Sequence, residues 1–325
     1  MKLVEEALRG STRALGKLIS IIENQAEESQ KILSELYYRT GKARVIGMTG
    51  PPGVGKSTLL GKLAEKFLER GFSIGILAVD PSSPITGGSL LGDRIRFSAL
   101  ANSHRVFIRS LSSRGALGGI SQATFNIVRL LDAIGYDVII VETIGVGQDE
   151  VEVAHLADTM VLVLAPGFGD EIQALKAGII ELADIFVVNK ADLPGADMYV
   201  TILEKIVRDT SLEKRWVPSV VKTSALNNEG LELLVDELDR HALFFAEHYR
   251  KREYKKNRLH RELVKLIEKM VKDRLEIFLE KCPQLEVILD EVVEGQKDPY
   301  LAANQLVDLF WHNVKLNKNR EDREI

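Results

Sequence analysis

Short apolar runs alternate with stretches of helical spacing from residue 43 to about residue 225. Each run is almost continuously apolar, which is typical of strands that are buried on both faces of a parallel sheet. The runs predict strands at residues 44–49, 73–79, 106–110, 138–141, 159–165, 185–188 and 219–223. The pattern therefore predicts an α/β fold with a mostly parallel, doubly wound sheet that is covered by helices on both faces.

Helical spacing also occupies the first 42 residues. Two amphipathic segments run through residues 15–22 and 32–37, and Ser11 is placed to cap the first of them. The apolar stripes favour a pair of helices packed on the central domain over an independent arm that binds a partner. We therefore predict a helical N-terminal extension over residues 1–42.

The chain is predicted to be entirely helical from about residue 227 onward. A helix over residues 228–245 closes the central domain, which we place at 43–245. A long charged helix with one apolar stripe follows, Cys282 and its neighbouring proline break it, and Asp298 caps a further helix. This much apolar surface outside the central domain predicts a helical C-terminal dimerisation arm over residues 246–325. The apolar residues expected to be buried in the last helix are Leu306, Leu309, Phe310 and Trp311.

A glycine-rich motif stands between the first strand and the first helix of the central domain. The sequence Gly-Pro-Pro-Gly-Val-Gly-Lys-Ser at residues 50–57 fits the phosphate-loop pattern, and a P-loop NTPase is predicted. Glycine lets successive backbone N–H groups wrap a polyphosphate closely, while Lys56 reaches the β and γ phosphates and the Ser57 hydroxyl is placed to bind Mg²⁺. The nucleotide-binding residues expected here are Gly50, Gly53, Val54, Gly55, Lys56, Ser57 and Thr58.

Three acidic residues lie where a parallel sheet binds its ligands, after the carboxyl ends of strands. Asp80 follows the second predicted strand, Asp93 lies in the long polar loop after it, and Glu142 follows a strand expected beside the phosphate-loop strand. We predict that these carboxylates hold Mg²⁺ together with Ser57, or position water, and that they form the catalytic set with Lys56. Capping or turn formation is the alternative role for Asp80 and Asp93.

The residues after Glu142 predict slow hydrolysis. Gly145 is in register with the glycine of the Asp-x-x-Gly motif of many GTPases, but Val146 stands where Ras-like enzymes carry the glutamine that orients water. Gln148 could take that role only if the loop folds back. The predicted enzyme is therefore Mg²⁺-dependent and has a slow intrinsic rate.

The sequence Asn-Lys-Ala-Asp at residues 189–192 follows an apolar strand and matches the motif with which GTPases recognise guanine. The Asp192 carboxylate would accept hydrogen bonds from guanine N1–H and N2–H₂, which adenine does not offer in that arrangement. A site built on such hydrogen bonds can reject the other base by about 10⁴-fold, so GTP and GDP are predicted as ligands rather than ATP. Residues 223–226 fit the loop whose backbone N–H meets guanine O6. The residues expected to contact the base are Asn189, Lys190, Asp192, Ser224, Ala225 and Leu226.

The composition of the chain restricts its expected cellular location and the classes of partner that it is expected to bind. The net charge of −4 argues against general affinity for nucleic acid or acidic membranes, and the basic residues between 250 and 261 are interpreted as the solvated face of a long helix. Cys282 is the only cysteine, so no intrachain disulfide can form. The first residues do not resemble a secretory signal, and no apolar run approaches membrane-spanning length. We therefore expect a cytoplasmic protein with no nucleic-acid or membrane partner.

Taken together, these motifs resemble those of the MeaB/ArgK/MMAA family of P-loop GTPases. The resemblance rests on residues 50–57, 79–84, 92–94, 142–148 and 189–192, and the glutamate at position 142 is among its specific features. It implies a homodimeric GTPase chaperone for an adenosylcobalamin-dependent acyl-CoA mutase, most often methylmalonyl-CoA mutase. GTP binding and hydrolysis would gate cofactor loading and help to remove inactivated cobalamin, and a cobalamin adenosyltransferase is a further candidate partner.

The resemblance assigns phosphate, Mg²⁺ and guanine to the same residues that the motifs predict. It adds a third switch at residues 167–176, with Lys176 as a candidate for coupling the nucleotide to the partner.

Three other functions stay open at this point. The first is a kinase or ATPase that serves a lysine/arginine/ornithine transport system, against which residues 189–192 argue because they favour guanine. The second is a GTPase that inserts a metal, but the chain has a single cysteine and its six histidines are scattered. The third is a purely structural dimer or a nucleic-acid adaptor.

Overall fold

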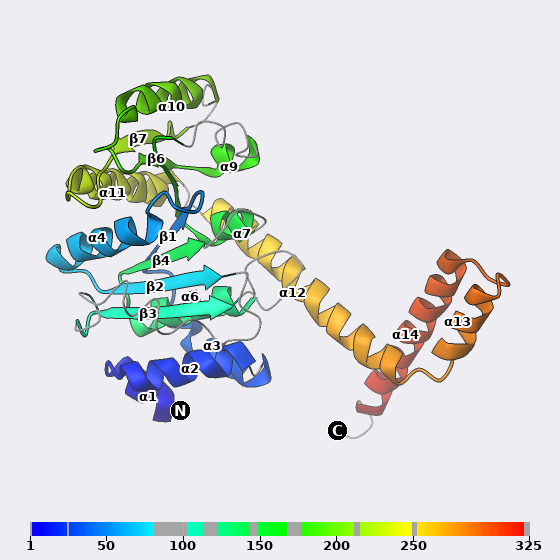
Figure 1. Cartoon of the computed structure of the whole chain (residues 1–325). Coiled ribbons are helices and arrows are strands. Elements are labelled where there is room, and N and C mark those ends of the chain that lie inside the picture. The colour runs from blue at the N-terminus through cyan, green and yellow to red at the C-terminus, as the bar shows by residue number, and fades with distance from the viewer. Residues whose placement is uncertain are drawn as a thin grey trace. The chain divides into compact units, whose positions relative to one another are not determined.

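The computed structural model describes residues 2–24, 26–80, 100, 103–112, 122–143, 149–167, 177–210, 215–248 and 252–321. The chain forms two compact units, Met1–His248 and Tyr249–Ile325. The first unit contains a sheet and the N-terminal helices, and the described part of the second unit is helical (Figure 1). The division into three parts, with boundaries after residues 42 and 245, stays a prediction.

A seven-stranded parallel sheet forms the centre of the first unit, with the strand order β3-β2-β4-β1-β5-β6-β7 (Figure 1). This order confirms the predicted doubly wound α/β fold. The central strand β1 lies between β4 and β5, so the strand that leads into the phosphate loop is flanked by the strand that carries Glu142. The strands are β1 (Arg44–Thr49), β2 (Ile74–Asp80), β3 (Val106–Ser112), β4 (Val138–Thr143), β5 (Thr159–Leu164), β6 (Ile185–Val188) and β7 (Ser219–Lys222).

Three strands extend further at their carboxyl ends than the apolar pattern predicts. β2 and β3 stay paired as far as Asp80 and Ser112, and β2 and β4 as far as Val79 and Thr143. Backbone hydrogen bonds form whatever the polarity of the side chain, so polar residues can continue a strand. The sheet therefore carries polar residues at the edge where α/β folds bind ligands.

Helices cover both faces of the sheet. Helices α4 (Lys56–Glu69) and α11 (Leu231–His248) pack on one face, where they share a core with residues such as Val161 and Val163 of β5. On the opposite face, Leu162 and Leu164 of the same strand pack against α10 (Ala196–Thr210). Successive residues of a strand point to opposite faces, which is why β5 contributes to two separate cores. The other helices of the central part are α6 (Gln122–Ile134), α7 (Asp149–Leu156) and α9 (Ala177–Leu182).

The N-terminal extension packs on the sheet domain, as its apolar stripes predict. Leu15, Leu18 and Ile19 are buried in one core with residues of α6 and of β3. Ser11 Oγ accepts a hydrogen bond from Ala14 N at 3.2 Å, which is the predicted cap. The elements of the extension are α1 (Lys2–Leu8), α2 (Thr12–Asn24), α3 (Ala26–Leu36) and the 3-10 helix η1 (Tyr37–Arg39).

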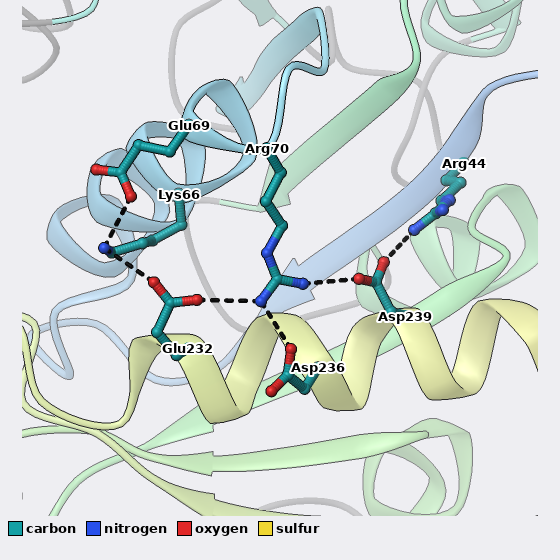
Figure 2. Close-up of polar contacts among 7 residues, drawn as sticks. All are labelled: Arg44, Lys66, Glu69, Arg70, Glu232, Asp236 and Asp239. Carbon is teal, nitrogen blue, oxygen red and sulfur yellow. Dashed lines mark hydrogen bonds and ion pairs between the residues drawn. The ribbon is translucent and has the colours of Figure 1, made fainter.

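A network of charged side chains joins the end of α4 to α11 (Figure 2). Arg70 is its hub, because its guanidinium donates to Glu232 at 3.0 Å, to Asp236 at 2.7 Å and to Asp239 at 2.8 Å. The hydrogen bond to Asp236 is the largest cause that raises the pKa of Arg70, and Lys66 is the largest cause that lowers the pKa of Glu232. A planar guanidinium presents several donors at once, so one residue can hold three side chains spread over about two turns of a facing helix. The network comprises Arg44, Lys66, Glu69, Arg70, Glu232, Asp236 and Asp239.

The second unit contains α12 (Arg252–Glu280), α13 (Leu285–Val293) and α14 (Pro299–Glu321). The break near Cys282 is confirmed, and so is the cap at Asp298, whose Oδ1 accepts from Tyr300 N at 2.8 Å. Phe310 is buried, but the predicted burial of Trp311 is wrong, because 49% of its surface is exposed. Adjacent residues of a helix point in directions about 100° apart, so both rings cannot face the same partner helix. Among the helices that the structure describes, none combines the length and the apolar character needed to cross a membrane.

Candidate functional site

The phosphate loop connects the end of β1 to the start of α4. Gly50, Gly53 and Gly55 have φ angles of 142°, 81° and 91°, in the region that favours glycine. A Cβ on Gly50 would lie 2.0 Å from the carbonyl oxygen of Val163 in β5. A Cβ on Gly55 would lie 2.6 Å from Asn189 Nδ2. The loop is therefore packed against both β5 and the Asn-Lys-Ala-Asp motif, and glycine is needed for space as well as for conformation.

Lys56 lies inside this loop and is buried. Its Nζ donates to the carbonyl oxygens of Gly50 at 2.6 Å and of Pro51 at 3.0 Å. The ammonium group is thus already directed across the loop, where a bound polyphosphate would lie. Thr58 is exposed in the first turn of α4, where backbone N–H groups and the helix dipole favour an anion.

Glu142 and Ser57 face each other beside the loop. Glu142 is 2% exposed, and its Oε1 accepts a hydrogen bond from Ser57 Oγ at 2.8 Å. Ile140, two residues earlier on the same strand face, packs in the core that contains α4, which explains why the glutamate reaches this helix. Mg²⁺ prefers oxygen ligands and often takes only one or two from protein, with water and phosphate completing its shell. The pair therefore fits a site for magnesium bound together with a nucleotide.

The structure describes the other two predicted carboxylates, Asp80 and Asp93, only in part. Asp80 is the last residue of β2, which pairs with β4, so its backbone lies at the same edge of the sheet as Glu142. The side chain of Asp80 and the whole of Asp93 lie outside the described residues. Within the described ranges, no group of three or more His, Cys, Asp and Glu side chains could hold a metal ion.

Asn189 connects three segments around the predicted guanine site. It is 2% exposed, and its Nδ2 donates to the carbonyl oxygen of Val54 in the phosphate loop at 2.9 Å. Its Oδ1 accepts from Ala225 N at 3.1 Å and from Thr223 Oγ1 at 3.2 Å. A buried amide with both ends satisfied holds these segments in one arrangement. Asn189 therefore joins the phosphate loop to the loop after β7.

Asp192 is exposed, and its Oδ1 accepts a hydrogen bond from Ser224 Oγ at 2.6 Å. This hydrogen bond is the largest cause that lowers the pKa of the Asp192 carboxyl below its usual value. The carboxylate is consequently ionised at neutral pH, as an acceptor for guanine N–H groups must be. Two other residues of the predicted guanine site are also placed. Lys190 has a backbone φ of 57°, and Leu226 lies on the loop after β7 with 79% of its surface exposed.

A comparison of the amino-acid sequence with models of protein families supports the same assignment as these motifs and their geometry. The model of the methylmalonyl-CoA mutase-associated GTPase MeaB matches residues 15–278. The chain belongs to the MeaB family. It is therefore a P-loop GTPase, as the motifs predict.

Relatives of this MeaB-family chain cover most of its length. A protein of Pyrococcus abyssi that is named as a GTPase is 42% identical over 309 residues, which are 94% of this chain and 95% of the relative. The GTPase ArgK of Escherichia coli is 37% identical over 235 residues, which are 69% of this chain and 70% of the relative. The crystal structure of a LAO/AO transport system kinase superposes with a TM-score of 0.69 at 25% identity, covering 95% of this chain and 97% of that one.

The structure of this MeaB-family chain also shows contacts that its motifs do not predict. The Val54 carbonyl, the Thr223 hydroxyl and the Ser224 hydroxyl all take part in holding the guanine motif. The sequence predicts a guanine loop at residues 223–226, but nothing in their spacing indicates that Ser224 contacts Asp192. The predictions for Gln148 and Lys176, and most of the predicted third switch, lie outside the described residues.

Proposed function

We propose that this GTPase is a chaperone that gates the loading of adenosylcobalamin onto an acyl-CoA mutase, with methylmalonyl-CoA mutase as the first candidate, and that it protects or reactivates that enzyme. The family match carries the proposal, since the family is described by its association with methylmalonyl-CoA mutase. A cobalamin adenosyltransferase is proposed as a third component, and the cytoplasm as the location.

In this proposal the loop glycines, Lys56 and Thr58 bind the phosphates of GTP. Asp192 binds the guanine ring, and the residues around the ring are Asn189, Lys190, Ser224, Ala225 and Leu226. Ser57 and Glu142 would hold Mg²⁺, with Asp80 and Asp93 as further carboxylates near it. Magnesium, when bound, would neutralise charge on the β and γ phosphates. The close Ser57 and Glu142 oxygens, 2.8 Å apart, support this placement.

Slow intrinsic hydrolysis suits such a chaperone. Val146 stands where Ras-like enzymes carry a water-orienting glutamine. The GTP state would then last until the mutase partner promotes hydrolysis, and the partner would respond to the difference between the GTP and GDP states. Affinity for the mutase and for nucleotide would be coupled reciprocally.

A kinase that serves a transport system is the alternative suggested by the similar LAO/AO transport system kinase. The guanine motif argues for GTP, because the Asp192 carboxylate is an acceptor for guanine N–H groups that adenine lacks, and Ser224 holds this carboxylate in place. Metal insertion is the other alternative, against which the single cysteine and the scattered histidines of the sequence argue.

We further propose that the protein is a homodimer and that α12 supplies part of its interface. Leu263, Ile267 and Met270 recur at helical spacing, and 56%, 57% and 49% of their surfaces are exposed in the single chain. Such a stripe on a charged helix is typical of a surface that packs against another helix.

Replacing Ile267 with glutamate should therefore convert the dimer to a monomer, because a carboxylate would be buried against apolar residues. The measurement is the mass in solution by light scattering. Lys272→Glu places the same side chain on the opposite side of α12, where 70% of the lysine side chain is exposed, and should leave the dimer intact. A wild-type protein of one-chain mass would contradict the proposal.

The chaperone role is tested by GTP turnover with and without purified cobalamin-dependent mutases. We expect one of them, methylmalonyl-CoA mutase first, to form a complex with this protein and to accelerate phosphate release from GTP. ATP in place of GTP serves as the specificity control. The assignment fails if none of the mutases binds or stimulates hydrolysis, and phosphate release from ATP at an equal rate would favour the kinase alternative.

A further inference from the structure

The backbone ladder between β1 and β4 ends just before the phosphate loop. Its last pair is Met48 with Glu142. On their other sides the two strands continue one residue further, since β1 pairs with β5 as far as Thr49 and β2 pairs with β4 as far as Thr143. Gly50, with its φ of 142°, then turns β1 into the loop. Thr49 and Thr143 thus stand side by side without a backbone pair between them.

A hydrogen bond between side chains joins the two strands at this point instead. Thr143 Oγ1 donates to Thr49 Oγ1 at 2.9 Å. Thr49 is 0% exposed and Thr143 is 1% exposed, so water does not compete for these hydroxyl groups. A hydrogen bond between buried groups is costly to lose, because the remaining hydroxyl is left without this partner.

The side chains of the threonine pair and of Glu142 lie on opposite faces of the sheet. Glu142 reaches Ser57 on α4, and the alternation of side chains along β4 directs Thr143 to the other face. That face is closely packed near β1, since a Cβ on Gly47 would lie 2.5 Å from Val153 Cγ1 of α7. The strand end that carries Glu142 is therefore held from both faces, by the threonine pair on one and by Ser57 on the other.

We propose that Thr49 and Thr143 are positioning residues that hold Glu142 in place relative to the phosphate loop and so determine how tightly magnesium retains the nucleotide. This inference rests on the proposed magnesium site at Ser57 and Glu142. Neither threonine is proposed to touch the nucleotide or the metal.

The test is the release rate of fluorescent GDP in magnesium and in excess EDTA. Thr143→Val keeps the shape of the side chain but removes its hydroxyl. We expect it to accelerate release in magnesium roughly tenfold, in proportion to the loss of one buried hydrogen bond, and to leave the rate in EDTA unchanged. Thr143→Ser keeps the hydroxyl and should restore a rate close to that of the wild type.

Thr49→Val gives an independent variant, and the double variant Thr49→Val/Thr143→Val completes the cycle. If the two hydroxyls act through one hydrogen bond, the double variant should release GDP no faster than either single variant. Equal acceleration in magnesium and in EDTA, or equal effects of valine and serine at position 143, would overturn the positioning role. If magnesium does not slow GDP release from the wild-type protein, the proposed magnesium site itself fails, and the inference fails with it.

Discussion

Replacing Asp192 with asparagine is expected to weaken GTP binding by about 10³-fold. Guanine N1–H and N2–H₂ would lose their carboxylate acceptor and would meet an amide N–H instead. The same substitution should improve binding of xanthosine triphosphate, whose base carries a carbonyl where guanine carries the amino group. The measurement is the affinity for each nucleotide by competition against fluorescent GDP.

Asp192→Asn should alter base recognition without disturbing the surrounding structure. Asp192 is exposed and held by Ser224 at 2.6 Å, and asparagine retains an oxygen that can accept the same hydrogen bond. Ser224 also holds the pKa of Asp192 below its usual range, so the wild-type residue is ionised throughout neutral pH.

Asp197→Asn is the matched control, since this residue is an exposed aspartate of α10 that pairs with Lys222 at 2.7 Å. It should leave the affinity for every nucleotide unchanged. If Asp192→Asn binds GTP as well as the wild type does, residues 189–192 do not recognise guanine, and the preference for GTP over ATP loses its basis.

The second large effect is expected for Lys56→Ala, which should reduce the rate of GTP hydrolysis by about 10²–10³-fold and weaken nucleotide binding. Lys56 Nζ lies within the phosphate loop, 2.6 Å from the carbonyl oxygen of Gly50. Alanine would remove the only lysine charge of the motif from the place where charge develops on the transferred phosphoryl group. The measurements are single-turnover hydrolysis of GTP and the affinity for GDP.

Lys62→Ala is the control from the same helix, because this lysine forms a surface ion pair with Glu65 at 3.0 Å. Both side chains are half-buried, and ion pairs near the surface contribute little to stability, so this variant should hydrolyse GTP like the wild type. Unaltered hydrolysis and affinity in Lys56→Ala would instead support a structural dimer or adaptor, with the loop playing no part in catalysis.

Patterns that act over a short stretch of sequence are sufficient to predict much of the fold. They predict all seven strands, because buried parallel strands are almost wholly apolar, but they underestimate the strand ends where polar residues such as Asp80 and Thr143 continue the ladder. They do not separate the helix α13 from its neighbours, and they wrongly predict that Trp311 is buried. The second error arises because helical spacing alone does not say which face of a helix meets a partner.

The sequence by itself determined the phosphate loop and the guanine motif, since each depends on residues that are close together along the chain, and it determined the family through the order of such short motifs. Only the tertiary structure decided that Glu142 meets Ser57, that Asn189 joins the phosphate loop to the loop after β7, and that Thr143 meets Thr49. Hydrogen bonds require their partners within about 3 Å in a suitable orientation. For residues 85, 135 and 94 positions apart, that proximity is set by the strand order and register of the sheet, which local spacing does not encode.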